Sequence, residues 1–225
     1  MSAALSLDEP SEFDLHRQGT AAFVLSLRER GVFDLHVLRA METVPRDFFA
    51  PRRFADLARS DVALPIACGQ TMTAPAVIAA MLVALEIRPG QRVLEIGTGT
   101  GYVTALLARA GAEVHSVERR PVLAEAAQRR LRLAGLGEPQ LLCGDGLDAA
   151  GVQGRYHRIL LNGVVPYLSP ALTSRLVAGG RLVGGAIAGG APRLLTVSRS
   201  LSGELAHELG ATIRVSPLMA SSAGH

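Results

Sequence analysis

A glycine-rich turn is the segment of this sequence whose spacing points most directly to chemistry. Gly97, Gly99 and Gly101 alternate directly after a short apolar run, and the acid Glu95 stands within that run. A dinucleotide-binding loop would place its third glycine at the position that Tyr102 occupies here. Glycine lets the backbone approach a ligand closely. We interpret the tighter turn as a site for a compact ligand with an amino-acid moiety, with Glu95 facing a positive group; the alternative is a plain strand-to-helix turn.

The next two apolar runs also end on acids. Glu118, followed by Arg119, closes the first run, and Asp145 with Gly146 closes the second. An acid at the first position can accept the ribose hydroxyls of an adenosine. Asp145 is placed to accept from an adenine amino group, while Gly146 lets the backbone come close. Taken singly, Glu118 is equally typical of a solvated charge at a helix entry and Asp145 of an Asp-Gly turn. Three acids at successive strand ends favour a nucleoside site.

The basic residues exclude several other chemistries. All 23 of them are arginine, which excludes Schiff-base chemistry, a P-loop lysine and a lysine general base. The net charge of +3 comes from an excess of arginine in residues 149–225. That excess can attract anionic partners. The arginines are scattered and not interleaved with aromatic residues, so we expect no nucleic-acid binding.

Cysteine usage and hydropathy indicate a cytoplasmic protein. Cys68 and Cys143 are far apart in the sequence, with neither zinc-ligand spacing nor a secreted disulfide framework. Residues 1–10 lack the pattern of a signal peptide. The longest apolar stretch, residues 74–87, is interrupted by Glu86 and is too short to cross a bilayer. We therefore expect no membrane partner. No pattern in the sequence indicates an oligomeric state.

The elements that would position these residues alternate between strands and helices. All six Phe residues lie within the first 54 positions. We therefore distinguish an N-terminal helical and loop layer, residues 1–68, from a ligand-binding domain, residues 69–225. We expect the two to pack together as one compact unit. The order predicts an α/β fold with a doubly wound, mostly parallel, Rossmann-like sheet. Predicted helices cover residues 13–30, 34–43, 76–87, 102–110, 121–133 and 170–177. Predicted strands cover residues 92–96, 113–117, 140–143, 158–161, 181–187, 194–199 and 212–215.

Together these motifs resemble a known family of sites. The segment 95–102, the acid Glu118 and the turn 144–146 resemble the S-adenosylmethionine site of Rossmann-type methyltransferases. The segments 44–51, 63–66 and 69–75, the last reading Gly-Gln-Thr-Met-Thr-Ala-Pro, resemble protein-L-isoaspartate O-methyltransferase. The similarity runs from about Arg28 to Leu218.

The resemblance implies protein repair. That family transfers a methyl group from S-adenosylmethionine to the α-carboxylate of an L-isoaspartyl residue in a damaged protein or peptide. Its Gln-Thr-x-Ser segment covers the cofactor, and its serine is the active-site residue; the corresponding residue here is Thr73. Gln70, Thr71 and Met72 are then expected at the same edge of the cofactor. Because a carboxylate is already ionised at pH 7, the reaction needs no general base.

The chain departs from the family pattern on the side of the methyl acceptor. Its residues 162–166 read Asn-Gly-Val-Val-Pro where the family usually has Thr-Ala-Ala-Ala-Pro, and Ala191–Arg193 replaces a segment that carries a glutamine. Two alternatives therefore stay open at this point. One is a diverged methyltransferase that modifies another peptide carboxylate or a small acid. The other is a cofactor-binding protein without turnover.

Overall fold

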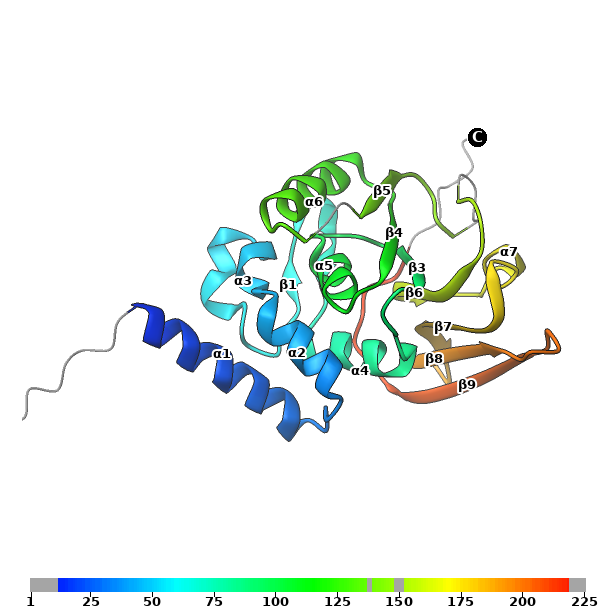
Figure 1. Ribbon diagram of the computed structural model, residues 1–225, viewed down its shortest axis with the longest axis horizontal. Helices are drawn as coiled ribbons and strands as arrows, with labels where there is room; N and C mark the ends of the chain where they lie inside the picture. Colours follow the sequence, from blue (N-terminus) through cyan, green and yellow to red (C-terminus); the bar gives the residue numbers. More distant parts are fainter. Residues whose placement is uncertain (1–11, 137–138, 148–151, 219–225) are drawn as a thin grey trace, which may run out of the picture.

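The computed structural model describes residues 12–136, 139–147 and 152–218, and its centre is a seven-stranded sheet (Figure 1). The expectation about a signal peptide falls on residues 1–10, outside the described residues. The strand order is β5-β4-β3-β6-β7-β8-β9. The strands are β3 (Arg92–Ile96), β4 (Glu113–Glu118), β5 (Gln140–Cys143), β6 (Tyr156–Val165), β7 (Leu176–Ala188), β8 (Ala191–Arg199) and β9 (Leu205–Thr212).

Strands β3 to β7 pair in parallel, and β8 and β9 are added antiparallel at one end. Chain order reverses between β3 and β6, which is where a ligand crevice is expected in such a sheet. The predicted fold class, a doubly wound and mostly parallel α/β sheet with an N-terminal helical layer, is confirmed.

Alternating apolar side chains along the strands supply two hydrophobic cores. On β6, Leu160 belongs to one core, whereas Ile159 and Leu161 belong to the other. A parallel sheet of this kind needs cover on both faces. Helices α4 (Pro75–Leu85), α5 (Tyr102–Arg109), α6 (Pro121–Leu133) and α7 (Pro170–Thr173) pack on it. Within the described ranges, no helix is both long and apolar enough to span a membrane.

The N-terminal layer shares the first of these cores. Phe23, Leu27 and Phe49 are buried in the same cluster as Val93 of β3 and Leu106 of α5. The N-terminal layer therefore packs on the sheet through a core that the two share. The layer contains α1 (Glu12–Glu29), α2 (Leu35–Thr43), α3 (Arg46–Phe49), the 3₁₀ helix η1 (Arg52–Leu57) and the short strand β1 (Leu64–Pro65). The 3₁₀ helix η2 (Ala67–Gly69) crosses its boundary, and the short strand β2 (Thr71–Met72) follows it.

Two predicted elements near the C-terminus are wrong. The predicted helix over residues 170–177 ends at Thr173, and β7 begins at Leu176, which pairs with Tyr156 of β6. The predicted strand over residues 212–215 is instead β9, which ends at Thr212. Because β9 is an edge strand exposed along almost its whole length, it lacks the apolar alternation by which strands are recognised.

After β9 the chain returns across the carboxyl end of β6, and we call residues 213–218 the C-terminal strap. The Val164 N–H donates to Ser216 O over 2.9 Å, and the Leu218 N–H donates to Val164 O over 2.8 Å. This close approach depends on Gly163, where a Cβ would lie 2.7 Å from both Ser216 O and Leu218 Cγ.

Gly163→Ala should displace the C-terminal strap, since the added methyl group meets backbone that cannot rotate away. We expect a loss of about 1–3 kcal/mol in the free energy of unfolding, measured by urea denaturation. Gly144→Ala is the matched control, because no atom lies within 4 Å of the added Cβ. Equal stability of the two variants would contradict this account of the strap.

Candidate functional site

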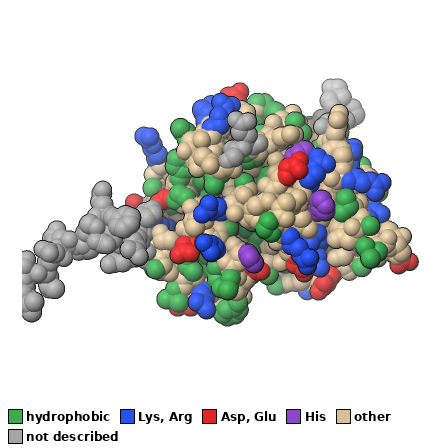
Figure 2. Space-filling view, in the orientation of Figure 1, with side chains coloured by type: hydrophobic (Ala, Val, Ile, Leu, Met, Phe, Trp, Pro, Cys, Tyr) green, Lys and Arg blue, Asp and Glu red, His purple; other side chains and the backbone are tan. Residues whose placement is uncertain are grey.

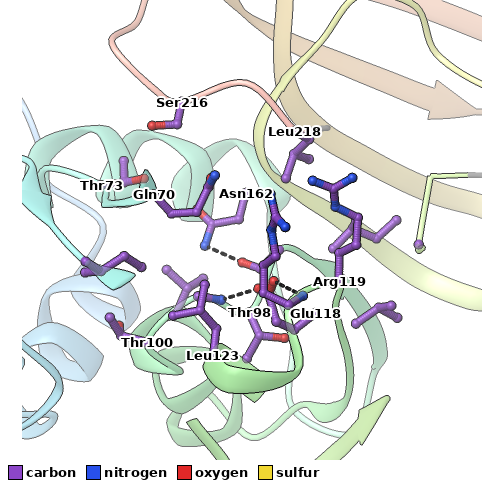
Figure 3. A pocket seen from close by; sticks show the side chains of 18 of the residues that line it. Gln70, Thr73, Thr98, Thr100, Glu118, Arg119, Leu123, Asn162, Ser216 and Leu218 are labelled. Atoms are coloured by element: carbon purple, nitrogen blue, oxygen red, sulfur yellow. Dashed lines mark hydrogen bonds between the residues drawn. The ribbon is translucent and has the colours of Figure 1, made fainter. Parts of the chain in front are cut away.

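A pocket opens at the carboxyl ends of β3, β4, β5 and β6, where the sheet order reverses (Figure 3). It encloses about 840 Å³, counting the part that is open to solvent. Ten of the twelve residues predicted for the site line it. They are Gln70, Thr71, Met72, Thr73, Gly97, Gly99, Glu118, Arg119, Asp145 and Gly146.

The glycine turn has a left-handed backbone at each of its three glycines. The φ angles are +94° at Gly97, +55° at Gly99 and +88° at Gly101, a region that residues with a Cβ rarely adopt. Gly101 does not line the pocket. It precedes α5, and a Cβ there would lie 3.2 Å from Ala127 of α6. Its role is to let two helices approach each other beside the pocket.

Glu118 connects the glycine turn to the next strand. Its carboxylate accepts the Gly99 N–H over 2.9 Å and the Arg120 N–H over 2.8 Å, and the residue is buried (Figure 3). Each carboxylate oxygen keeps a further lone pair, so Glu118 can still accept hydroxyl groups of a ligand. It is therefore both a support for the turn and an acceptor in the pocket wall.

Asp145 and Gly146 form a turn in the pocket wall. Asp145 Oδ1 accepts the Leu147 N–H over 2.9 Å, as in an Asp-Gly turn, and the residue also lines the pocket. A Cβ at Gly146 would lie 2.9 Å from Ile96 Cγ2. The close packing of this turn on β3 therefore requires glycine.

Glu95 lies behind the pocket and does not face a ligand. Its side chain is fully buried, and its Oε2 accepts hydrogen bonds from the Thr104 hydroxyl at 2.5 Å and the Ser116 hydroxyl at 2.7 Å. Ser116 also shares a hydrogen bond with the hydroxyl of Thr98, a residue of the glycine turn. The expectation that Glu95 answers a positive group of the ligand is corrected: it supports the turn from inside the core. Burial raises the pKa of Glu95 to about 7, against the lowering effect of these hydroxyls.

The segment Gln70–Thr73 closes the pocket from the N-terminal side. Strand β2 pairs with β1, and Thr73 follows it as a buried residue in the pocket wall. The Thr71 hydroxyl hydrogen-bonds the Ser216 hydroxyl of the C-terminal strap. Segments from opposite ends of the chain therefore meet at the mouth (Figure 3).

Sequence reasoning missed several residues of the wall. Asn162 was noted as a departure from the family but not as a site residue; its Nδ2 donates to Gly97 O over 3.1 Å. Ser216, Pro217 and Leu218 line the pocket through the C-terminal strap. No spacing in the sequence indicates the C-terminal strap, because its position depends on how the chain turns back after β9. Asn162 directly follows the predicted strand 158–161, which was the available signal, although β6 continues to Val165.

Comparisons with known families agree on one description. Residues 18–221 match the family model described as Protein-L-isoaspartate(D-aspartate) O-methyltransferase. A Nitrobacter winogradskyi protein named protein-L-isoaspartate O-methyltransferase is 48% identical over 161 residues, covering 72% of this chain and 74% of that protein. A Rhodopseudomonas palustris (strain HaA2) protein named protein-L-isoaspartate O-methyltransferase 1 is 39% identical over 213 residues, covering 94% and 86%.

Solved structures agree in fold. A structure titled protein-L-isoaspartate O-methyltransferase matches with a TM-score of 0.77 at 23% identity, covering 89% of this chain and 66% of that one. A Plasmodium falciparum structure, titled as a putative enzyme of the same name in complex with S-adenosyl-L-homocysteine, matches with a TM-score of 0.75 at 17% identity. It covers 91% of this chain and 98% of that one.

The raised pKa of Glu95 predicts a pH-dependent stability. A carboxyl whose pKa is about 7 when folded and about 4.5 when unfolded binds its proton more tightly in the folded state. The free energy of unfolding should therefore fall as the pH rises from 4.5 to 7, by about 2–3 kcal/mol from this group. In Glu95→Gln, an uncharged side chain of the same shape, this contribution should vanish.

Urea denaturation of both proteins at pH 5 and pH 8 measures this difference. Glu125→Gln, on the exposed surface of α6, is the control for removal of a carboxylate. Parallel pH profiles for wild type and Glu95→Gln would contradict the assignment.

Proposed function

Because the chain belongs to the protein-L-isoaspartate O-methyltransferase family, we propose that the pocket described above holds its cofactor and that Thr73 is its active-site residue. The protein is an S-adenosylmethionine-dependent O-methyltransferase that acts on the carboxylate of L-isoaspartyl residues in damaged proteins. The single observation that carries the site assignment is the meeting of Thr73 with the acids of the strand ends in one pocket.

The chemistry of the pocket wall fits an adenosyl sulfonium cofactor. Glu118 and Asp145 supply acceptors where ribose hydroxyls and an adenine amino group need them. Apolar side chains of Ile96, Val117 and Leu123 provide a surface for a planar base. S-adenosylmethionine supplies an electrophilic methyl group on its positively charged sulfur.

The residues near the acceptor side have a purely positional task. The attacking carboxylate belongs to the substrate and is ionised at neutral pH, so no side chain has to remove a proton. The Thr73 hydroxyl can donate to that carboxylate and fix its direction of approach. Because Thr73 is buried, the hydrogen bond forms in a site from which bulk water is largely excluded.

Transfer of labelled methyl from S-adenosylmethionine to an isoaspartyl peptide tests the activity. A base-labile ester should form on that peptide, while the normal aspartyl peptide of the same sequence stays unlabelled. Equal labelling of both peptides would favour a methyltransferase of other specificity. Tight cofactor binding without any ester would indicate a protein that binds and does not turn over.

Thr73→Ala should lower kcat about 10- to 100-fold in this assay, since a hydrogen bond to a charged group is worth about 1.5–3 kcal/mol. Thr73→Ser keeps the hydroxyl and should retain most of the activity. Loss of activity in both variants would show that the methyl group of Thr73, and not its hydroxyl, is what the site requires.

Glu118→Ala should weaken S-adenosylhomocysteine binding about 10- to 100-fold, because an acceptor is lost and the Gly99 N–H is left without its partner. Calorimetry measures the dissociation constant. Glu125→Ala removes the same charge from the exposed side of α6 and should bind like wild type. If both variants bind equally well, Glu118 is not part of the cofactor site.

We also propose a cytoplasmic location and a peptide or protein carboxylate as the partner. Cys68 and Cys143 are free and exposed, which fits a reducing compartment. Arginines lie in several separate groups on the face shown in Figure 2, and no stripe suited to nucleic acid is expected. The core shared by the N-terminal layer and the sheet supports one compact unit. Cell fractionation of the tagged protein tests the location.

A further inference from the structure

Arg46 is a buried cation whose hydrogen bonds reach the segment that carries Thr73. The residue is 2% exposed. Its Nη1 donates to Ala58 O over 2.8 Å, and its Nη2 donates to Val62 O and to Thr73 O, each over 3.0 Å. One guanidinium therefore joins three separate stretches of backbone, and one of them is the wall of the pocket.

The Arg46 guanidinium stays protonated at neutral pH despite its burial. Loss of solvent lowers the pKa of Arg46 to about 10, while nearby Tyr102 and Asp61 oppose this shift. The three hydrogen-bond acceptors are all carbonyl oxygens, so backbone dipoles solvate the charge. A planar guanidinium can donate in several fixed directions at once, which a lysine ammonium on a flexible stem cannot reproduce.

Thr73 lies in a short connection that has few other constraints. Strand β2 is paired with β1 only as far as Met72, and α4 begins at Pro75. Beyond Thr73, the Ala76 N–H donates to Asp61 Oδ1 over 2.8 Å. Within the part of the chain that the structure describes, the hydrogen bond from Arg46 is the one that reaches Thr73 itself, between the pairing of β2 on one side and the first turn of α4 on the other.

We propose that Arg46 is a positioning residue for methyl transfer: by holding the Thr73 carbonyl, it fixes the direction of the Thr73 hydroxyl at the acceptor side of the pocket. This inference rests on the role of Thr73 in the proposed function. Arg46 does not line the pocket, and of the three backbone carbonyls that it holds, only that of Thr73 belongs to a residue of the pocket wall. The N-terminal layer then has a defined purpose, which is to orient the wall of the pocket that carries Thr73, while the other walls come from the sheet, the helices α5 and α6 and the C-terminal strap.

Arg46→Lys and Arg46→Met test this role. Both variants should lose about 10-fold or more in kcat toward the isoaspartyl peptide, as expected when a reacting group is misplaced by a fraction of an ångström or more. Their dissociation constants for S-adenosylhomocysteine should stay within about twofold of wild type, because the cofactor contacts come from the strand ends. Arg53→Lys and Arg53→Met are the matched controls: Arg53 is exposed in the same layer and lies over the Phe54 ring.

A double-mutant cycle with Thr73→Ala separates positioning from general support. If Arg46 acts through the Thr73 hydroxyl, Arg46→Lys combined with Thr73→Ala should be no slower than Thr73→Ala alone, within about twofold. If the double variant instead shows the product of the two single losses in kcat, the proposal for Arg46 is overturned and the role of Thr73 stays intact. A fully active Thr73→Ala variant would overturn the proposed role of Thr73 and, with it, this inference.

The cycle remains informative if the Arg46 variants do not fold. Thermal melting and S-adenosylhomocysteine binding report on folding. In that case Asp61→Ala replaces them, since it removes the acceptor of the Ala76 N–H on the other side of Thr73. The same non-multiplied loss with Thr73→Ala is expected, and a multiplied loss again overturns the proposal that the N-terminal layer positions Thr73.

Discussion

The register between β3 and β4 is the constraint on which the pocket depends. Glu95 lies directly opposite Ser116, so the Ser116 hydroxyl can bind Glu95 and, on its other side, Thr98 of the glycine turn. From the end of the same strand, Glu118 binds the turn at Gly99. A slip of one residue would turn both side chains of β4 to the wrong face of the sheet. Sheet pairing therefore determines the shape of a turn that makes few sheet hydrogen bonds of its own.

The walls of the pocket come from two structures with different means of support. On the side that we propose for the cofactor, Glu118 and Asp145 lie at the ends of the paired strands β4 and β5, and this pairing supports their positions. On the acceptor side, Thr73 lies in irregular backbone, where a buried guanidinium and a capping carboxylate replace the missing sheet hydrogen bonds. Met72, next to Thr73, packs in the apolar core shared with the N-terminal layer, whereas Val117 and Leu147, next to Glu118 and Asp145, pack in the other core. Changes in the N-terminal layer can thus reach the acceptor side without altering the cofactor side.

The sequence predicts the cofactor half better than the acceptor half, and the reason is physical. Apolar runs locate parallel strands, and acids such as Glu118 that follow those runs must gather at one edge of the sheet. Glu95 is different, because a strand buried on both faces does not reveal which side chain faces a ligand and which faces a helix. The partners of Arg46 are carbonyl oxygens, which no sequence pattern marks. The C-terminal strap depends on an exposed edge strand, β9, whose side chains carry no periodic signal.

The absence of lysine and of a general base is consistent with this division. When the nucleophile is already ionised, the protein has to orient the reacting groups and exclude water, but it does not have to transfer a proton. Direction comes from hydrogen bonds in fixed geometry, which a guanidinium provides more rigidly than an ammonium. The charged groups with the deepest burial, Glu95 and Arg46, accordingly lie one layer behind the pocket. Arg46 holds backbone carbonyls there, and Glu95 holds the hydroxyls of Thr104 and Ser116. Because these buried groups support the pocket wall from behind, the wall itself can consist of small residues such as glycine and threonine.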